Sequence, residues 1–116
     1  MPRFVILEHD HPYLHWDLML QAGNVLRTWR LDAPPRPGQV VSATALGDHR
    51  LEYLDYEGPV SNNRGIVKRW DRGEYKGVVD ENEMSAIAIR GERLAGMLRM
   101  SHLQEPAWTV QYVADA

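Results

Sequence analysis

The sequence predicts an all-β fold, on the evidence of its hydrophobic periodicity and of its turn residues. Apolar and polar residues alternate with a period of two along most of the 116 residues, which is the spacing of half-buried β-strands. Clusters of Gly, Pro, Asn and Asp interrupt this alternation at short intervals, as they do in β-sandwiches and β-barrels. We therefore expect short loops and little helix.

The first strand is expected at residues 3–9 (RFVILEH). Residues 14–21 and 25–31 flank the turn Ala22-Gly23-Asn24 and predict a β-hairpin. Three prolines and a glycine at residues 34–38 form a loop, because neither a helix nor a central strand accepts them. Six further strands are expected, at residues 39–46, 65–71, 74–79, 84–91, 93–100 and 108–113.

Residues 83–100 carry the one ambiguous pattern. Their Glu, Met, Ala, Leu and Arg residues all favour a helix. Gly91 and Gly96 interrupt the segment, however, and two strands are the better interpretation.

Length and composition limit the class of protein. A chain of 116 residues with 44% hydrophobic residues has the size of one domain with its own core, so we expect a single domain over residues 1–116. The absence of cysteine excludes disulfides, thiolate metal sites and cysteine nucleophiles. The sequence contains no apolar run of membrane-spanning length and no signal-like N-terminus, so the expected location is the cytoplasm, without a membrane partner.

The net charge of −3 argues against a general polyanion-binding protein, yet five cations crowd into one short segment. These are Arg64, Lys68, Arg69, Arg72 and Lys76. Two interpretations are open: a local basic face for an anionic partner, or the solvated surface of an exposed hairpin.

The segment HDHPYLHWD, residues 9–17, contains three of the five histidines and two carboxylates. In the strand that follows the loop, His15 and Asp17 fall on the face opposite to Trp16 and Leu18. The loop at residues 10–13 is short enough to bring His9 beside His15. Two imidazoles and one carboxylate would then converge, a ligand set suited to Mn, Fe or Zn with open coordination positions. The alternative is that both histidines are satisfied by backbone groups and that Asp17 caps a turn; His11, beside Pro12, reads as a loop residue.

His49 and Tyr53 form a second pair. They are four residues apart in GDHRLEYLDYEG and would share a face of an extended strand. An imidazole and a phenol that face the same way can donate hydrogen bonds or protons to a phosphate.

Several motifs, taken in order, resemble the 3′-phosphoesterase domain of bacterial ligase D and its stand-alone relatives. They begin with F-V-I-x-x-H, L-H-W-D, L-x-x-W and D-H-x-L-x-Y-x-D-Y-E-G, and continue with W-D-R-G-x-Y, G-E-R-L-x-G-x-x-R-M and a final Trp. The similarity extends from Phe4 to about Tyr112.

The resemblance implies a compact antiparallel β-barrel with a metal site on its outer surface. It implies His9, His15 and Asp17 as ligands of Mn²⁺ or another divalent transition metal, and His49 with Tyr53 as the pair that contacts the scissile phosphate. The implied activity removes a 3′-terminal ribonucleotide and then the 3′-phosphate from DNA or RNA–DNA ends in DNA end repair. The implied partners are such ends and a separate ligase or polymerase.

The sequence departs from the family pattern at three cations. The resemblance implies an arginine at Met19, a lysine near Ala33 and an arginine at Val41. Each lost cation would weaken phosphate binding, since a charge-assisted hydrogen bond is worth roughly 1.5–3 kcal/mol. Arg27, Arg30 and Arg50 are the candidate substrate-binding residues that would compensate. The loop GPVSNNRG also lacks the glycine-rich PEGxYG run of typical members.

Three functions are therefore compatible with the sequence. The first is a metal-dependent 3′-phosphoesterase with altered substrate preference. The second is a non-catalytic barrel that binds nucleic acid or a repair partner. The third is a metalloenzyme that uses the same His/His/Asp set on a small molecule.

Overall fold

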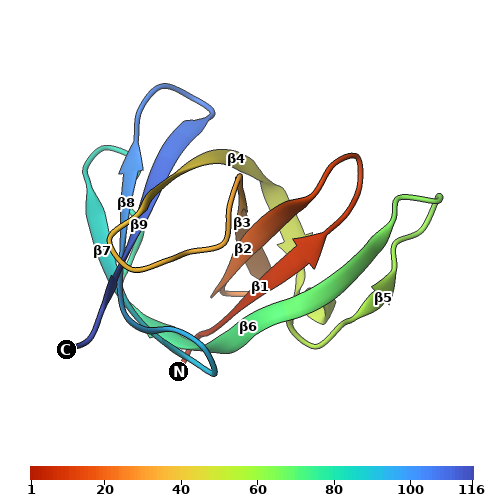
Figure 1. Ribbon diagram of the computed structural model, residues 1–116, viewed down its shortest axis with the longest axis horizontal. Helices are drawn as coiled ribbons and strands as arrows, with labels where there is room; N and C mark the ends of the chain where they lie inside the picture. The colour runs from red at the N-terminus through yellow and green to blue at the C-terminus, as the bar shows by residue number, and fades with distance from the viewer.

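A computed structural model describes residues 1–116 as one antiparallel sheet that closes into an eight-stranded barrel (Figure 1). Closure follows because β1 pairs with β2 on one side and with β6 on the other. The strands are β1 (Arg3–His9), β2 (His15–Ala22), β3 (Val25–Leu31), β4 (Val40–Arg50), β5 (Gly58–Pro59), β6 (Ile66–Lys76), β7 (Ser85–Gly91), β8 (Ala95–His102) and β9 (Ala107–Ala114). The all-β prediction is confirmed. The helical content is one short 3₁₀ helix, η1 (Leu51–Leu54), and no helix has the length and apolar character that a membrane crossing needs.

The segment from residue 65 to residue 79 was predicted as two strands, and this prediction is wrong. A single strand, β6, extends from Ile66 to Lys76. Gly73, which falls in the gap between the two predicted strands, pairs with Gly91 inside the strand, and a Cβ there would overlap the backbone of Arg90. Glycine therefore allows the two strands to approach closely and does not end either of them.

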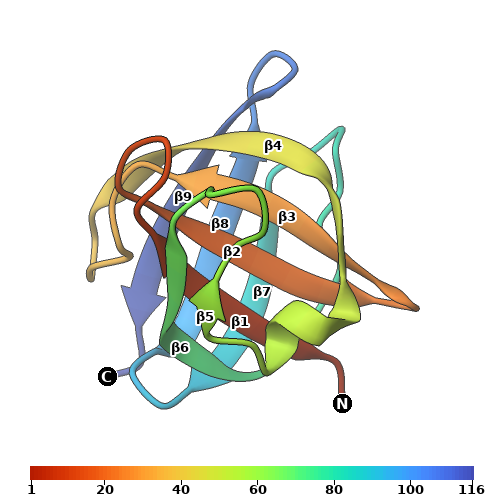
Figure 2. The same cartoon turned by 90° about the vertical axis from the view of Figure 1, so that its right-hand side faces the viewer.

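Residues 49–53 do not form the extended strand on which His49 and Tyr53 were expected to share a face. Strand β4 continues to Arg50, and the chain then turns into η1 and the short strand β5, which pairs with the start of β6. Figure 2 shows η1 and β5 lying over the outer face of β1 and β2. This arrangement covers part of the barrel wall from outside.

Two apolar clusters result, one on each face of the wall. The larger contains 18 buried residues inside the barrel, among them Phe4, Ile6 and Leu18. The smaller contains six, among them Leu7 and Met19, between the wall and the η1 segment. Both faces of β1 are therefore buried, which explains why its sequence reads as a continuous apolar run.

Asp71 organises the turn between β7 and β8. Its side chain is 1% exposed and accepts hydrogen bonds from the backbone N–H groups of Arg72, Glu92, Arg93 and Leu94. The Asp of the W-D-R-G motif thus has a structural role, and it explains why residues 83–100 form two strands joined by a tight turn.

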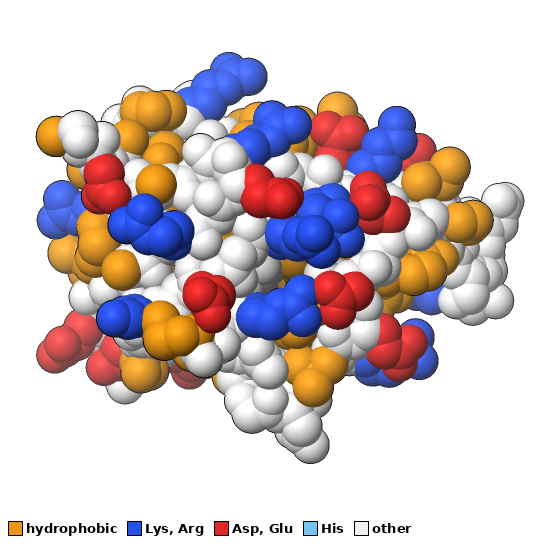
Figure 3. Space-filling view, turned by 90° about the horizontal axis from the view of Figure 1, so that it is seen from below, with side chains coloured by type: hydrophobic (Ala, Val, Ile, Leu, Met, Phe, Trp, Pro, Cys, Tyr) orange, Lys and Arg blue, Asp and Glu red, His pale blue; other side chains and the backbone are white.

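The crowded basic segment does not form one unpaired basic face. Arg69 pairs with Glu57, and Arg72 lies near Asp55 and Glu92. The face that lies below the barrel in Figure 1 shows Lys and Arg interspersed with Asp and Glu (Figure 3). Arg69 and Arg72 therefore belong to a surface of mixed charge and not to a basic face.

Candidate functional site

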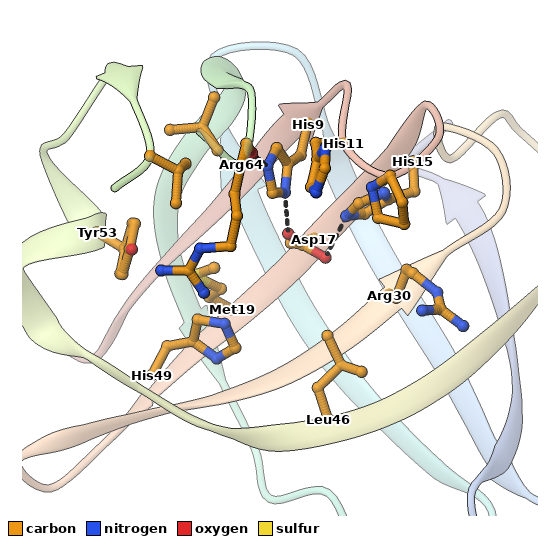
Figure 4. Close-up of a pocket in the computed structure, with 13 residues that line it drawn as sticks. His9, His11, His15, Asp17, Met19, Arg30, Leu46, His49, Tyr53 and Arg64 are labelled. Carbon is orange, nitrogen blue, oxygen red and sulfur yellow. Dashed lines mark hydrogen bonds and ion pairs between the residues drawn. The ribbon is translucent and has the colours of Figure 1, made fainter. Parts of the chain in front are cut away.

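A cavity of about 370 Å³ opens on the outer face of the barrel, beside the β1–β2 loop. The β5–β6 loop, the end of β4 and η1 complete its walls (Figure 4). Its lining combines three kinds of residue: titratable groups, two arginines, and an apolar floor that includes Met19, Leu46 and Val67.

His9, His15 and Asp17 meet at one end of this cavity. His9 ends β1 and pairs directly with His15 at the start of β2, and their ring centroids are 4.9 Å apart. Nδ1 of His9 lies 3.7 Å from Oδ2 of Asp17, and Nε2 of His15 lies 3.4 Å from Oδ1. One ligand atom from each residue falls within 4.8 Å of the others. The predicted convergence of the three side chains is confirmed.

The remaining nitrogen of each imidazole contacts a backbone carbonyl. Nε2 of His9 is 2.7 Å from the oxygen of Arg64, and Nδ1 of His15 is 2.8 Å from the oxygen of Tyr13. These nitrogens must carry the proton, because a carbonyl only accepts. The lone pairs of His9 Nδ1 and His15 Nε2 are thereby directed toward Asp17, which is the arrangement that outer hydrogen bonds give to metal-bound histidines.

Asp17 supplies the test of whether a cation fits. Its side chain is 7% exposed, and Oδ1 is buried without a hydrogen-bond partner. A buried carboxylate oxygen without a partner is costly, and a divalent cation between it and two imidazole lone pairs would satisfy it. The ligand set therefore fits a metal ion of the class that binds nitrogen and oxygen ligands.

Burial alone would lower the pKa of His15, but the Asp17 carboxylate and the Tyr13 carbonyl outweigh it and raise the pKa above its ordinary value. The added proton would sit on Nε2, the nitrogen that faces Asp17. Protons and a metal ion therefore compete for the same lone pair.

His49 and Tyr53 lie across the cavity from this trio. Their rings are 5.8 Å apart and both line the cavity, although His49 is the next-to-last residue of β4 and Tyr53 belongs to η1. Nδ1 of His49 lies 2.9 Å from the carbonyl oxygen of Gly47, which leaves Nε2 free. The pair faces one way as predicted, but through a turn into a helix and not along one strand.

Of the three arginines predicted to compensate for lost cations, only Arg30 lines the cavity. Arg30 pairs with Asp17 across β2 and β3, which places it on the outer face. Arg27 donates to the carbonyl of Val79 and lies 5.1 Å from the ring of Trp29 in the main core. Arg50 is exposed and lies 3.7 Å from Glu52. The structure does not bring Arg27 or Arg50 to this cavity.

The three positions expected to have lost a cation lie in different parts of the structure. Met19 lines the cavity and is 2% exposed. Val41 is buried inside the barrel, and Ala33 packs against the same core. Of these three positions, only Met19 therefore lies in the cavity lining.

Arg64 is the charged residue of the cavity lining that the sequence did not single out as a site residue. It lies in the β5–β6 loop, and its side chain extends into the cavity toward His49 (Figure 4). The only signal was its place in a basic segment, because 55 residues separate it from His9.

The loop that carries Arg64 is held against the β1–β2 loop. Oδ1 of Asp10 accepts the N–H of Ile66 at 2.8 Å, and this hydrogen bond is the main cause that lowers the pKa of Asp10. Gly65 has a φ of +80°, and a Cβ there would overlap Oδ1 of Asp10. Glycine is therefore required both by conformation and by close approach.

Comparison with known proteins identifies one family over most of the chain. The family model of the DNA Ligase D 3′-phosphoesterase domain matches residues 7–109, a range that includes the trio, His49, Tyr53 and Arg64.

Curated relatives include the multifunctional non-homologous end joining protein LigD of Pseudomonas aeruginosa, 31% identical over 104 residues. That match covers 81% of this chain and 12% of the relative. The protein of the same name from Mycolicibacterium smegmatis is 24% identical over 97% of this chain and 17% of its own length.

The chain thus spans less than a fifth of the length of the curated relatives that it matches. The motifs that suggested the family lie in one barrel. The two histidines and the aspartate converge, His49 and Tyr53 of the D-H…Y motif line the same cavity, and Asp71 of W-D-R-G accepts hydrogen bonds from the turn between β7 and β8. The chain belongs to the family of DNA ligase D 3′-phosphoesterase domains.

Proposed function

We propose that this chain is a divalent-metal-dependent phosphoesterase that acts on nucleic-acid 3′ ends during DNA repair. The observation that carries the proposal is the orientation of His9 and His15, whose outer N–H groups point to carbonyl oxygens while their lone pairs face Asp17. Membership of the 3′-phosphoesterase family supports the end-processing role.

His9, His15 and Asp17 would hold the metal, which we propose to be manganese or another divalent transition metal. When bound, such an ion offsets the negative charge of phosphate oxygens. The remaining chemistry belongs to the side chains across the cavity.

His49 and Tyr53 would act on the substrate phosphate. Nε2 of His49 would donate a proton to the oxygen whose bond to phosphorus breaks, while water adds to the phosphorus and releases one of its own protons to the solvent. The Tyr53 hydroxyl donates a hydrogen bond to a non-bridging oxygen and so orients the phosphate. The same pair would serve both the removal of a 3′-terminal ribonucleotide and the removal of the 3′-phosphate that remains.

The test is a 3′-end assay with a panel of divalent metals. One primer ends in a single ribonucleotide, and a second ends in a 3′-phosphate. The proposal predicts product with Mn²⁺, no product with EDTA, and at least a hundredfold slower turnover for His9→Ala and His49→Ala. Metal binding by a wild-type protein that leaves both primers intact would contradict it.

A second function is favoured by Met19, the apolar residue in the cavity wall where the family resemblance implies an arginine. On that account the barrel binds nucleic-acid ends, or a separate ligase or polymerase, without turnover. Binding that EDTA leaves unchanged, in a protein inactive with every metal of the panel, would support this alternative.

A further inference from the structure

The cavity holds an excess of cationic groups over carboxylates. Asp17 is the one acidic residue in the lining, which also contains four histidines and two arginines. An anion would therefore be attracted to it, and a cavity with partly buried walls strengthens that attraction relative to an open surface.

The two cavity arginines have no carboxylate partner within 4.0 Å. Six other arginines lie within 4.0 Å of a carboxylate: Arg3, Arg27, Arg50, Arg69, Arg72 and Arg90. Neither Arg30 nor Arg64 forms such a pair. Their charges are therefore not neutralised within the chain and remain available to an anionic ligand.

Arg30 points away from His49 and Tyr53 (Figure 4). Its guanidinium lies 5.4 Å from the ring of Tyr13 and one nitrogen lies 3.5 Å from the hydroxyl of Thr44. Arg64 extends to the opposite side of the cavity, toward His49 (Figure 4). Its Nε donates to the carbonyl of Ser61 at 2.9 Å and Nη2 donates to the Ser61 hydroxyl at 3.2 Å, which aims the side chain and leaves Nη1 free.

The loop that presents Arg64 is ordered by the candidate metal site itself. The carbonyl of Arg64 accepts a hydrogen bond from the His9 N–H, and Oδ1 of Asp10 accepts one from the N–H of Ile66. Within the loop, the N–H of Val60 donates to the carbonyl of Gly65 at 2.8 Å. Asn62 and Asn63 adopt left-handed backbone conformations, with φ of 62° and 57°, which asparagine tolerates better than most residues. The guanidinium is thus preorganised and loses less freedom when it binds a ligand.

We propose that Arg64 is a substrate-binding residue that grips the phosphate at the nucleic-acid 3′ end, beside His49 and Tyr53. One N–H of Nη1 and the second N–H of Nη2, which Ser61 does not use, can donate two parallel hydrogen bonds to phosphate oxygens. The positive charge is thus supplied by Arg64 from the β5–β6 loop, whereas the β2 position where the resemblance implies an arginine is the apolar Met19. This inference rests on the proposed function for the identity of the substrate, but it can be tested without turnover.

The experiment compares two oligonucleotides that differ only in a 3′-phosphate or a 3′-hydroxyl. Their dissociation constants are measured by fluorescence anisotropy at low salt and in EDTA, so that the metal contributes nothing. The quantity of interest is the ratio of the two constants, because general charge attraction to the strand affects both equally.

Wild-type protein is expected to prefer the 3′-phosphate. Arg64→Ala should reduce that preference at least about tenfold, the loss expected for one charge-assisted contact. Arg64→Lys should recover part of it, since the charge returns without the fork. Arg99→Ala is the matched control, because Arg99 is exposed on β8, outside the cavity, and its loss should leave the ratio unchanged.

Two results would overturn the inference: a ratio for Arg64→Ala equal to that of wild type, or a wild-type protein without preference for the 3′-phosphate. Mn²⁺ titration of Arg64→Ala separates this failure from failure of the metal site. The variant keeps its main-chain carbonyl, so its metal affinity should match that of wild type. A reduced metal affinity would show that the side chain supports the loop instead of binding phosphate.

Discussion

The imidazole of His9 donates its Nε2 proton to the carbonyl oxygen of Arg64 across a distance of 2.7 Å. This contact joins the end of β1 to the β5–β6 loop and fixes which nitrogen of His9 faces Asp17. One residue of that loop therefore orients a candidate metal ligand through its backbone and enters the cavity through its side chain.

Removal of a trio side chain should abolish metal binding. Asp17→Asn keeps the shape of the side chain but removes the charge, so isothermal titration with Mn²⁺ is expected to show at least a hundredfold weaker binding. His11→Ala is the matched control, since His11 lines the cavity but stands outside the trio. Equal weakening by both variants would indicate a diffuse electrostatic effect and not a ligand set.

The close approach of Gly65 to Asp10 predicts that Gly65→Ala disturbs the metal site. The new methyl group would overlap Oδ1 of Asp10 and displace the Arg64 carbonyl from His9. Loss of such an outer hydrogen bond typically costs 10- to 100-fold in metal affinity, and a titration with Mn²⁺ measures it. Gly38→Ala has a similar left-handed conformation (φ +77°) with no neighbour within 4 Å, so it reports backbone strain alone and should leave the metal affinity unchanged.

Asp71 accepts hydrogen bonds from four backbone N–H groups. We therefore expect this side chain to contribute strongly to stability. Asp71→Ala should lower the free energy of unfolding by about 3 kcal/mol or more, because buried donors lose their acceptor. Urea unfolding measures the change, with Glu83→Ala, an exposed substitution in the β6–β7 loop, as control. A loss below about 1 kcal/mol would mean that water replaces the carboxylate at little cost.

The ion pair between Arg3 and Asp55 predicts a pH dependence of stability. The hydrogen bond from Arg3 is the main cause that holds the pKa of Asp55 below its ordinary value, with the charges of Arg3 and Arg72 adding to it. Because the pKa is lower in the folded state, the stabilisation is present above the unfolded pKa of Asp and is lost as the pH falls through the folded pKa. The difference in unfolding midpoint between wild type and Asp55→Asn should be largest at neutral pH and vanish in acid. A difference that grows as the pH falls would contradict the ion pair.

Most of the barrel strands and the convergence of His9, His15 and Asp17 could be predicted from the sequence because both depend on local order. Strand alternation determines which side chains share a face. The loop between β1 and β2 has only five residues, so it brings His9 and His15 next to each other. The same alternation excludes Arg27 from the outer cavity. Arg27 lies three positions from Arg30 on β3, so the two side chains point to opposite faces, and Arg27 points to the barrel interior.

Contacts between distant segments could not be predicted in this way. Arg64 reaches the cavity only because η1 and β5 fold back over the wall, and no pattern in GPVSNNRG indicates that path. The break predicted near Gly73 was wrong for a related reason, since the need for glycine there comes from the neighbouring backbone of β7.

Anomalous diffraction from a crystal soaked in Mn²⁺ tests the central claim most directly. The account predicts one strong peak bonded to Nδ1 of His9, Nε2 of His15 and a carboxylate oxygen of Asp17, with Nε2 of His9 still on the carbonyl of Arg64. A peak at any other group of residues, or a His9 ring turned so that Nε2 contacts the metal, would contradict it.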